Sequence, residues 1–287
     1  MSKIIEQTRG IINCFTIDLE DWYQGNEHVK MSSSHLYEDR IEYSTHLLLG
    51  LLEEYQIKVT FFVLGHNAEK KKSLIREIDQ RGHEIASHGY SHELVYRQTP
   101  DEFRNETIKA KSICEDIIGK PILGYRASNW TITKESLWAL DILREEGFVY
   151  DSSIFPTKNY LFGIPDSPRF SYVLNNGLLE IPPSTIKWQS ITFPFSGGFY
   201  FRILPLSMIC YGIRSVNQEG HPAVMYLHTW ELDVSQPRSG LPIPLKNKII
   251  HYARLSTVEG KLRNLLSQFK FNRMDTVFAQ NVSNHNI

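Results

Sequence analysis

The chain has 287 residues, of which 41% are hydrophobic and 22% charged, so a packed core is feasible and the composition argues against global disorder. Its 31 basic and 32 acidic side chains give a net charge of −1, which gives no reason to expect nucleic acid or an anionic membrane as a partner. The length allows one α/β barrel or two small domains.

Strand and helix patterns alternate along the chain. Apolar runs predict strands at residues 11–17, 59–64, 83–87, 122–126, 148–150, 178–181 and 223–228, with a last strand at 276–280. Apolar residues at helical spacing predict helices at 41–55, 67–81, 99–118, 134–146, 204–218 and 257–269, and residues 155–169 are rich in loop formers. The helix at 99–118 has the clearest bounds, because Thr99 and Glu102 match a capping box, Pro100 suits the first turn and Gly119 suits the end.

This alternation predicts a parallel sheet or barrel. No linker-like stretch or internal repeat divides the chain, so we expect one catalytic domain over residues 1–287. In barrels of this class, chemistry gathers at the carboxyl ends of the strands. Asp18, His88, Arg126 and His228 each follow or end a predicted strand, which indicates a shared site.

The cysteines and the N-terminus bear on the compartment. Cys14, Cys114 and Cys210 form no Cys-x-x-Cys pair, and we expect buried, reduced thiols. The first ten residues lack the apolar core of a signal peptide, and no segment approaches the roughly 18 apolar residues of a membrane span. These features predict a cytoplasmic protein without a membrane span, for which a homo-oligomer is possible.

Two histidines four residues apart suggest a metal site. On a helical turn, the spacing of His88 and His92 would put both imidazoles on one face, although Gly89 favours a tight turn instead. A catalytic metal usually needs a third ligand, and the carboxylates of Asp18, Glu20 and Asp21 follow another strand. One of them would bind the metal while another removes a proton from the attacking water. Taken alone, the carboxylates could instead form a strand-end turn or a helix cap, and the histidines could simply bond backbone carbonyls.

Other strand ends offer the remaining chemistry. His228 could be a general acid, oriented by Asp151, Glu231 or Asp233, or a histidine with only a structural role. Arg126 could hold a catalytic carboxylate, and Asn129 with Trp130 could supply a backbone N–H and an aromatic wall. Further substrate contacts are expected from the remaining aromatic and basic candidates, Tyr200, Arg202 and Trp230.

The ordered segments FTIDLEDW, HEIASHGYSHE, GYRASNW, YDSS and MYLHTWELD resemble the polysaccharide deacetylase family, carbohydrate esterase family 4 with NodB homology. The chain looks most like the cytoplasmic subgroup of bacterial exopolysaccharide and O-antigen loci. The resemblance implies a distorted (β/α) barrel, usually with seven strands. It also implies metal-dependent removal of an N-acetyl group from an amino sugar of a surface polysaccharide or its precursor.

By position, the resemblance makes Asp18 the base, Arg126 its orienting arginine and His228 the acid, with Asp151 in the motif that supports the acid. It makes His88 and His92 metal ligands. Relatives with an Asp-x-Asp or Asp-x-Glu pattern favour Glu20 as the third ligand, while Asp21 stays open. The family's usual Arg-x-Pro motif reads Arg126-Ala127-Ser128 here, which leaves the substrate in doubt more than the metal site.

The ligand types suit one divalent metal, zinc first, with cobalt, nickel, manganese and iron as alternatives. The partner would be an N-acylated sugar. Two other functions stay open. One is a deformylase or other amide hydrolase acting on a different N-acyl sugar or a cyclic amide. The other is a carbohydrate-binding protein without catalysis, against which the apparent base and acid pair argues, because binding alone needs neither.

Overall fold

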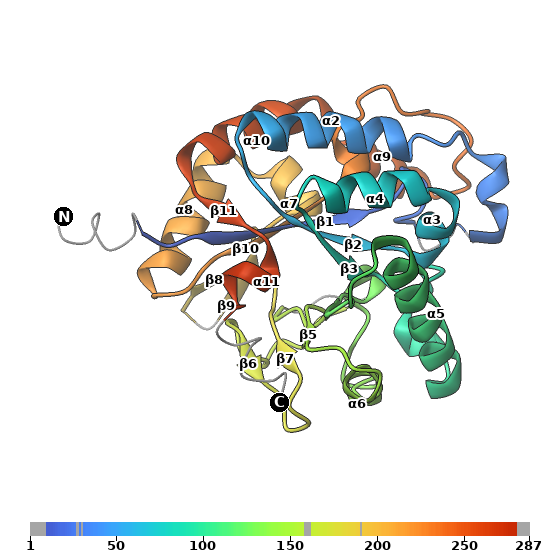
Figure 1. Ribbon diagram of the computed structural model, residues 1–287. Coiled ribbons are helices and arrows are strands. Elements are labelled where there is room, and N and C mark those ends of the chain that lie inside the picture. Colours follow the sequence, from blue (N-terminus) through green and yellow to red (C-terminus); the bar gives the residue numbers. More distant parts are fainter. Residues whose placement is uncertain (1–9, 27–28, 30, 158–161, 190, 280–287) are drawn as a thin grey trace.

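The computed structural model describes residues 10–26, 29, 31–157, 162–189 and 191–279. Within them, seven parallel strands form one continuous, curled sheet (Figure 1). Their order across the sheet is β10 (Val224–His228), β1 (Asn13–Leu19), β2 (Thr60–Val63), β3 (Glu84–Ser87), β4 (Gly124–Tyr125), β5 (Tyr150–Asp151) and β7 (Leu179–Glu180). The predicted α/β fold, a distorted seven-stranded barrel, is therefore confirmed.

The curled sheet does not close by a strand ladder between β7 and β10. Instead, Ser184 bridges the gap, since its backbone N–H donates to Val224 and its hydroxyl accepts from the Val224 N–H. Two short strands lie beside the seven: β6 (Tyr172–Val173) pairs antiparallel with β7, and β11 (Phe271–Asn272) pairs with β1. A separate hairpin is formed by β8 (Thr185–Trp188) and β9 (Ile191–Pro194).

Most of the helices cover the outside of the sheet, whereas α11 (Met274–Val277) puts Met274 into the interior cluster (Figure 1). The helices are α2 (Ile41–Glu54), α3 (Gly65–Lys70), α4 (Lys72–Gln80), α5 (Pro100–Ile118), α6 (Trp138–Glu145), α7 (Gly198–Ile203), α8 (Leu206–Gln218), α9 (Leu245–Tyr252), α10 (Val258–Gln268) and α11 (Met274–Val277). Short 3₁₀ turns are η1 (Met31–Leu36), η2 (Val95–Arg97), η3 (Ser128–Trp130), η4 (Thr229–Leu232) and η5 (Leu255–Thr257). Among the described residues, no helix combines the length and apolar character that a membrane crossing requires.

The alternation of side chains along each strand divides the core in two. In β1, Phe15, Ile17 and Leu19 pack outward against the helices, whereas Cys14 joins an interior cluster. Because side chains alternate with a period of two, Thr16 and Asp18 share the inward face of Cys14. The same alternation continues in the neighbouring strands, so the last inward position of a strand opens onto the carboxyl edge of the barrel.

Several predicted elements need correction. The strand at 276–280 is wrong where the structure describes it, because Thr276 lies in α11, which puts Met274 into the interior cluster; Gln280 lies outside the described residues. The helix at 67–81 is two helices, because Lys71 has non-helical angles of φ −123° and ψ 45°. The helix at 134–146 begins only at Trp138, after a turn in which Ser136 bonds Thr133. The capping box of α5 is confirmed, with Gly119 left-handed at its end.

Candidate active site

Four of the predicted site residues occupy inward positions at the carboxyl edge. Asp18 lies one residue before the end of β1, His228 is the last residue of the adjacent parallel strand β10, and the two are register partners. His88 follows β3 two positions after the interior residue Ala86, and Arg126 follows β4. The period of two therefore directs all four side chains to one end of the barrel. The structure brings these residues together, as the sequence predicted for strand ends.

Glu20, His88 and His92 form a compact group of three possible ligands. The Oε1 atom of Glu20 lies 3.0 Å from His88 Nε2 and 3.0 Å from His92 Nε2. Two ligands of a tetrahedral zinc ion lie about 3.3 Å apart, given bonds of about 2.0–2.1 Å, so the group is close to the size of a metal site. Among the residues that the structure describes, the second carboxylate oxygen, Oε2, is buried and has no hydrogen-bond partner. The donor set and the group's dimensions therefore fit a divalent ion.

The two histidines do not lie on a helical turn. Residues 88–92 form an irregular loop in which Gly89 has φ 74° and His92 has φ 59°. Glycine adopts this left-handed region without steric cost, which explains its place between the histidines. His88 Nδ1 lies 2.7 Å from the carbonyl oxygen of Arg126. If Nδ1 donates to that carbonyl, the lone pair of Nε2 is left to face Glu20.

Asp18 is held by Arg126. The guanidinium Nη1 donates to Asp18 Oδ1 at 2.8 Å and to the hydroxyl of Thr16, while Nη2 donates to Ser152 Oγ. Arg126 is fully buried, and its guanidinium lies over the ring of Trp130 at 4.6 Å. The buried arginine fixes the orientation of the Asp18 carboxylate and keeps a compensating charge beside it.

His228 lies between two carboxylates. Its Nε2 is 3.9 Å from Asp18 Oδ2, and its Nδ1 is 3.1 Å from Glu231 Oε2. Burial alone would lower the pKa of His228, but the charges of Glu20, Glu231 and Asp18 outweigh it and raise the pKa to about 9. Arg202 donates from Nε to Glu231 Oε1 at 2.7 Å and so fixes the carboxylate behind the imidazole.

Asp151 does not support His228. Tyr150 points into the interior cluster, so the next residue along the strand, Asp151, points to the other face, where Glu180 is its register partner. There Asp151 accepts hydrogen bonds from the backbone N–H and the hydroxyl of Ser153. The inward position belongs to Ser152, which contacts Arg126. Period-two alternation in YDSS could have identified this serine, which sequence reasoning missed.

Asp21 lies apart from the ligand group. Its carboxylate accepts from the backbone N–H groups of Trp22 and Arg40, and it lines a different cavity of about 160 Å³ with Tyr23 and His66. Burial raises the pKa of Asp21 to about 7. Of these two neighbouring carboxylates, Glu20 is therefore the one that lies beside the histidines.

The predicted substrate residues are mostly covered. Trp130 is buried against Arg126, Phe155 and Tyr226. Arg202 is 3% exposed and donates to backbone carbonyls of residues 250, 251 and 253 as well as to Glu231, so it does not form an open wall.

Trp230 is 6% exposed and stacks on His228 and His251. Tyr200 and Asn129 are partly exposed and stay available to a ligand. Asn129 has φ 51° in the turn η3, which begins two residues after Arg126.

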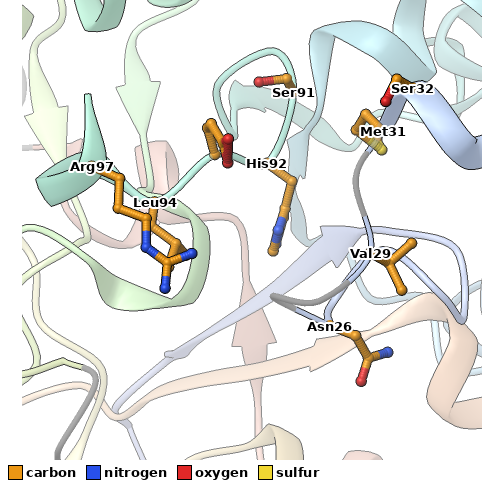
Figure 2. A pocket seen from close by; sticks show the side chains of 9 residues that line it. Asn26, Val29, Met31, Ser32, Ser91, His92, Leu94 and Arg97 are labelled. Atoms are coloured by element: carbon orange, nitrogen blue, oxygen red, sulfur yellow. The ribbon is translucent and has the colours of Figure 1, made fainter. Parts of the chain in front are cut away.

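A cavity of about 260 Å³ opens beside His92 (Figure 2). The figure shows the His92 imidazole between the side chains of Val29 and Met31 on one side and those of Leu94 and Arg97 on the other. The cavity combines apolar, hydroxyl, amide and charged side chains, which are Asn26, Val29, Met31, Ser32, Ser91, His92, Glu93, Leu94 and Arg97. It therefore provides a mixed surface next to the ligand group.

Comparison with known proteins identifies the class. A family model described as polysaccharide deacetylase matches residues 29–147, and a domain of unknown function, DUF3473, matches residues 152–279. Residues 29–147 therefore carry a polysaccharide deacetylase domain, as the motifs predicted, while the assignment to the cytoplasmic subgroup stays a prediction. Strands β2, β3 and β4 come from the first match and β7 and β10 from the second, so both matched segments build one sheet.

Relatives with curated descriptions match shorter regions. A peptidoglycan-N-acetylglucosamine deacetylase of Bacillus cereus is 39% identical over 72 residues, covering 25% of this chain and 26% of that protein. A peptidoglycan deacetylase of Helicobacter pylori is 34% identical over 110 residues, covering 37% of this chain and 36% of that protein. The matches thus span about a quarter to a third of these relatives.

Solved structures show the same fold over nearly the whole chain. A crystal structure described as a polysaccharide deacetylase from Mycobacterium smegmatis has a TM-score of 0.63 at 20% identity, covering 96% of this chain and 92% of that one. PuuE allantoinase has a TM-score of 0.61 at 18% identity, covering 97% and 92%. At these identities the likeness establishes the barrel fold.

Proposed function

We propose that the protein is a metal-dependent hydrolase that removes an N-acetyl group from an amino sugar of a bacterial surface polysaccharide or its precursor. One observation supports this proposal most directly. Glu20, His88 and His92 form a compact ligand group, and it lies on the same barrel edge as the Asp18–Arg126 pair and His228. A binding protein would need neither a fixed carboxylate nor a charged imidazole beside such a group.

Glu20, His88 and His92 would hold the metal. A divalent ion held there supplies Lewis-acid activation of the amide carbonyl and of the attacking water. The chain's own residues orient these ligands: the Arg126 carbonyl lies 2.7 Å from His88 Nδ1, and the hydroxyl of Thr229 donates to the Glu20 carbonyl at 2.7 Å. Such contacts behind metal ligands are typical of catalytic metal sites.

Asp18 is the proposed general base. Arg126 leaves Asp18 Oδ2 directed towards His228, on the open side of the site, while it holds Oδ1. Asp18 accepts the proton of the attacking water, and the fixed guanidinium keeps the carboxylate in place during the transfer. The backbone N–H of Asn129 is our candidate donor to the developing oxyanion, since the N–H of Trp130 already donates to Ala127.

His228 is the proposed general acid. With its pKa raised to about 9, the imidazole carries a proton at neutral pH and can donate it from Nε2 to the departing amine. Glu231, not Asp151, orients it through Nδ1. After the transfer, Asp18 holds the proton that it took from water, and the two groups exchange protons with solvent before the next turnover.

The substrate is proposed to enter by the cavity beside His92 (Figure 2). In this cavity, the hydroxyl and amide groups of Ser32, Ser91 and Asn26 can form hydrogen bonds with sugar hydroxyls. The apolar side chains of Val29 and Met31 can pack against the apolar face of a sugar ring. Zinc is the proposed ion because histidine and carboxylate ligands suit it, although they also suit cobalt, nickel, manganese and iron. The predicted domain extent, cytoplasmic location and homo-oligomer stay predictions that accompany this proposal.

The direct test measures amine release from N-acetylated, N-formylated and cyclic amide substrates, using metal-free protein and protein reloaded with zinc. The proposal expects turnover of an N-acetyl amino sugar only after reloading. Faster turnover of the N-formyl sugar or of the cyclic amide would instead show that the protein is a different amide hydrolase. Carbohydrate binding without any turnover, in protein of verified metal content, would contradict catalysis.

A further inference from the structure

Trp230 does not offer its ring to a sugar. The residue lies in η4, directly after β10, and its indole stacks on the imidazoles of His228 and His251 at centroid distances of 5.4 and 4.4 Å. The guanidinium of Arg202 lies 5.4 Å from the ring. With these neighbours Trp230 is 6% exposed, so its ring is covered by protein groups.

What remains of the indole is its N–H group. Trp230 Nε1 is buried and has no hydrogen-bond partner among the described residues. The Oε2 atom of Glu20 is also buried and unpartnered. An indole nitrogen can only donate and a carboxylate oxygen can only accept, so these two orphaned atoms are of complementary type. Buried polar atoms rarely stay unpaired, and each such case calls for an explanation.

Gly25 connects the two atoms in space. A Cβ atom added to Gly25 would lie 3.0 Å from Glu20 Oε2 and 3.9 Å from Trp230 Nε1. Both atoms therefore border the side of Gly25 that lacks a side chain. A single hydroxyl oxygen placed between them could accept from Nε1 and donate to Oε2, and would so satisfy both atoms.

We propose that Trp230 is a positioning residue for Glu20: its N–H, through one hydroxyl group beside Gly25, holds Oε2 away and leaves Oε1 directed at His88 and His92. The inference rests on the proposed function, since it treats Glu20 as a metal ligand. It deepens that function because it explains how the Glu20 carboxylate presents only one of its two oxygens to the proposed metal. The backbone of Glu20 is held independently by the Thr229 hydroxyl.

The test measures zinc affinity of the folded protein without sugar, by competition with a chromophoric chelator. Trp230→Phe keeps an aromatic ring but removes the N–H. We expect roughly a tenfold weaker zinc affinity, the size of effect usual for a lost contact behind a metal ligand. Trp22→Phe is the matched control, because Trp22 is also buried but donates its indole N–H to the carbonyl of Glu38. It should leave zinc affinity unchanged.

Gly25→Ala provides a second variant that keeps the indole and places a methyl group against Glu20 Oε2. It too should weaken zinc affinity. Zinc affinity within twofold of the parent in both variants would overturn the positioning role while leaving the proposed function standing. A parent protein that binds no divalent metal would instead overturn the proposed function and this inference together. A loss equal in Trp22→Phe and Trp230→Phe would assign the effect to general packing and overturn the inference.

Discussion

Asp18 and His228 are direct register partners on the adjacent parallel strands β1 and β10, and their carboxylate and imidazole lie 3.9 Å apart. Each is held from behind by a charge of the opposite sign, Arg126 for Asp18 and Glu231 for His228. The Asp18 carboxylate and the His228 imidazole therefore lie next to each other, and the pKa of the imidazole is raised to about 9. This relationship supports a base and an acid acting on the same substrate.

Replacing the proposed base tests its role without removing a metal ligand. In Asp18→Asn, the amide oxygen can still accept from Arg126, but the group cannot take a proton at neutral pH. We expect turnover to fall by about 10²–10⁴-fold, the usual contribution of a general base, with metal content unchanged. The measurements are amine release and elemental analysis of the same preparation. Full activity in this variant would rule out Asp18 as the base.

Removing one proposed ligand should remove the metal. His88→Ala deletes one of the two nitrogens that lie 3.0 Å from Glu20 Oε1, and two remaining ligands rarely retain a catalytic ion. We expect metal content to drop below about a tenth of the parent value after dialysis. His66→Ala is the control, since His66 lines a separate cavity with Asp21. Equal metal content in His88→Ala and the parent would refute the ligand assignment.

The alkaline limb of the pH–rate profile should depend on Glu231. Burial lowers the pKa of His228, and the carboxylates, including Glu231, raise it, so removing one negative charge should lower it. In Glu231→Gln, a protonated His228 is lost at lower pH, and the alkaline limb of kcat/KM should shift towards acid by about one pH unit. An unshifted limb, with the variant folded by circular dichroism, would show that His228 is not the titrating acid.

Stability should fall in mild acid because of His83. Burial, with the nearby cations Lys58, Arg81 and Arg273, lowers the pKa of His83 to about 4, and its Nδ1 accepts from the Val59 N–H. Between pH 6.5 and 4 the unfolded chain therefore binds a proton at His83 more readily than the folded chain does. The contribution of His83 to the free energy of unfolding is complete above pH 6.5 and is lost as the pH falls towards 4.

From this residue we expect a loss of about 2 kcal/mol in the free energy of unfolding between pH 7.5 and pH 5. Urea denaturation at the two pH values measures it. His83→Asn, whose amide oxygen can replace the acceptor, should show a smaller difference. The same pH dependence in parent and variant would assign the acid sensitivity to other groups.

Local patterns were sufficient where neighbouring residues decide the structure. The capping box of Thr99 and Glu102 and the left-handed Gly119 fix both ends of α5, because capping involves only groups within one turn. The strand that contains Asp18 was equally clear, since its residues are buried on both faces and most of them are apolar. In contrast, the strand expected at 276–280 depended on five residues without flanking support, and Thr276 lies in a short helix whose Met274 fills the barrel interior.

The sequence by itself determined the order of the seven barrel strands along the chain, the residues at the strand ends and the deacetylase domain to which the motifs belong. Only the tertiary structure decided which of two neighbouring carboxylates meets His88 and His92, and which acid stands behind His228. Spacing alone could not choose Glu20 over Asp21 as the metal ligand, or Glu231 over Asp151 as the partner of His228. The direction of each side chain decides both cases, and in YDSS the alternation along the strand turns Asp151 away from the site. Such directions are set by packing between strands that are far apart in the chain, as in the pairing of Asp18 with His228.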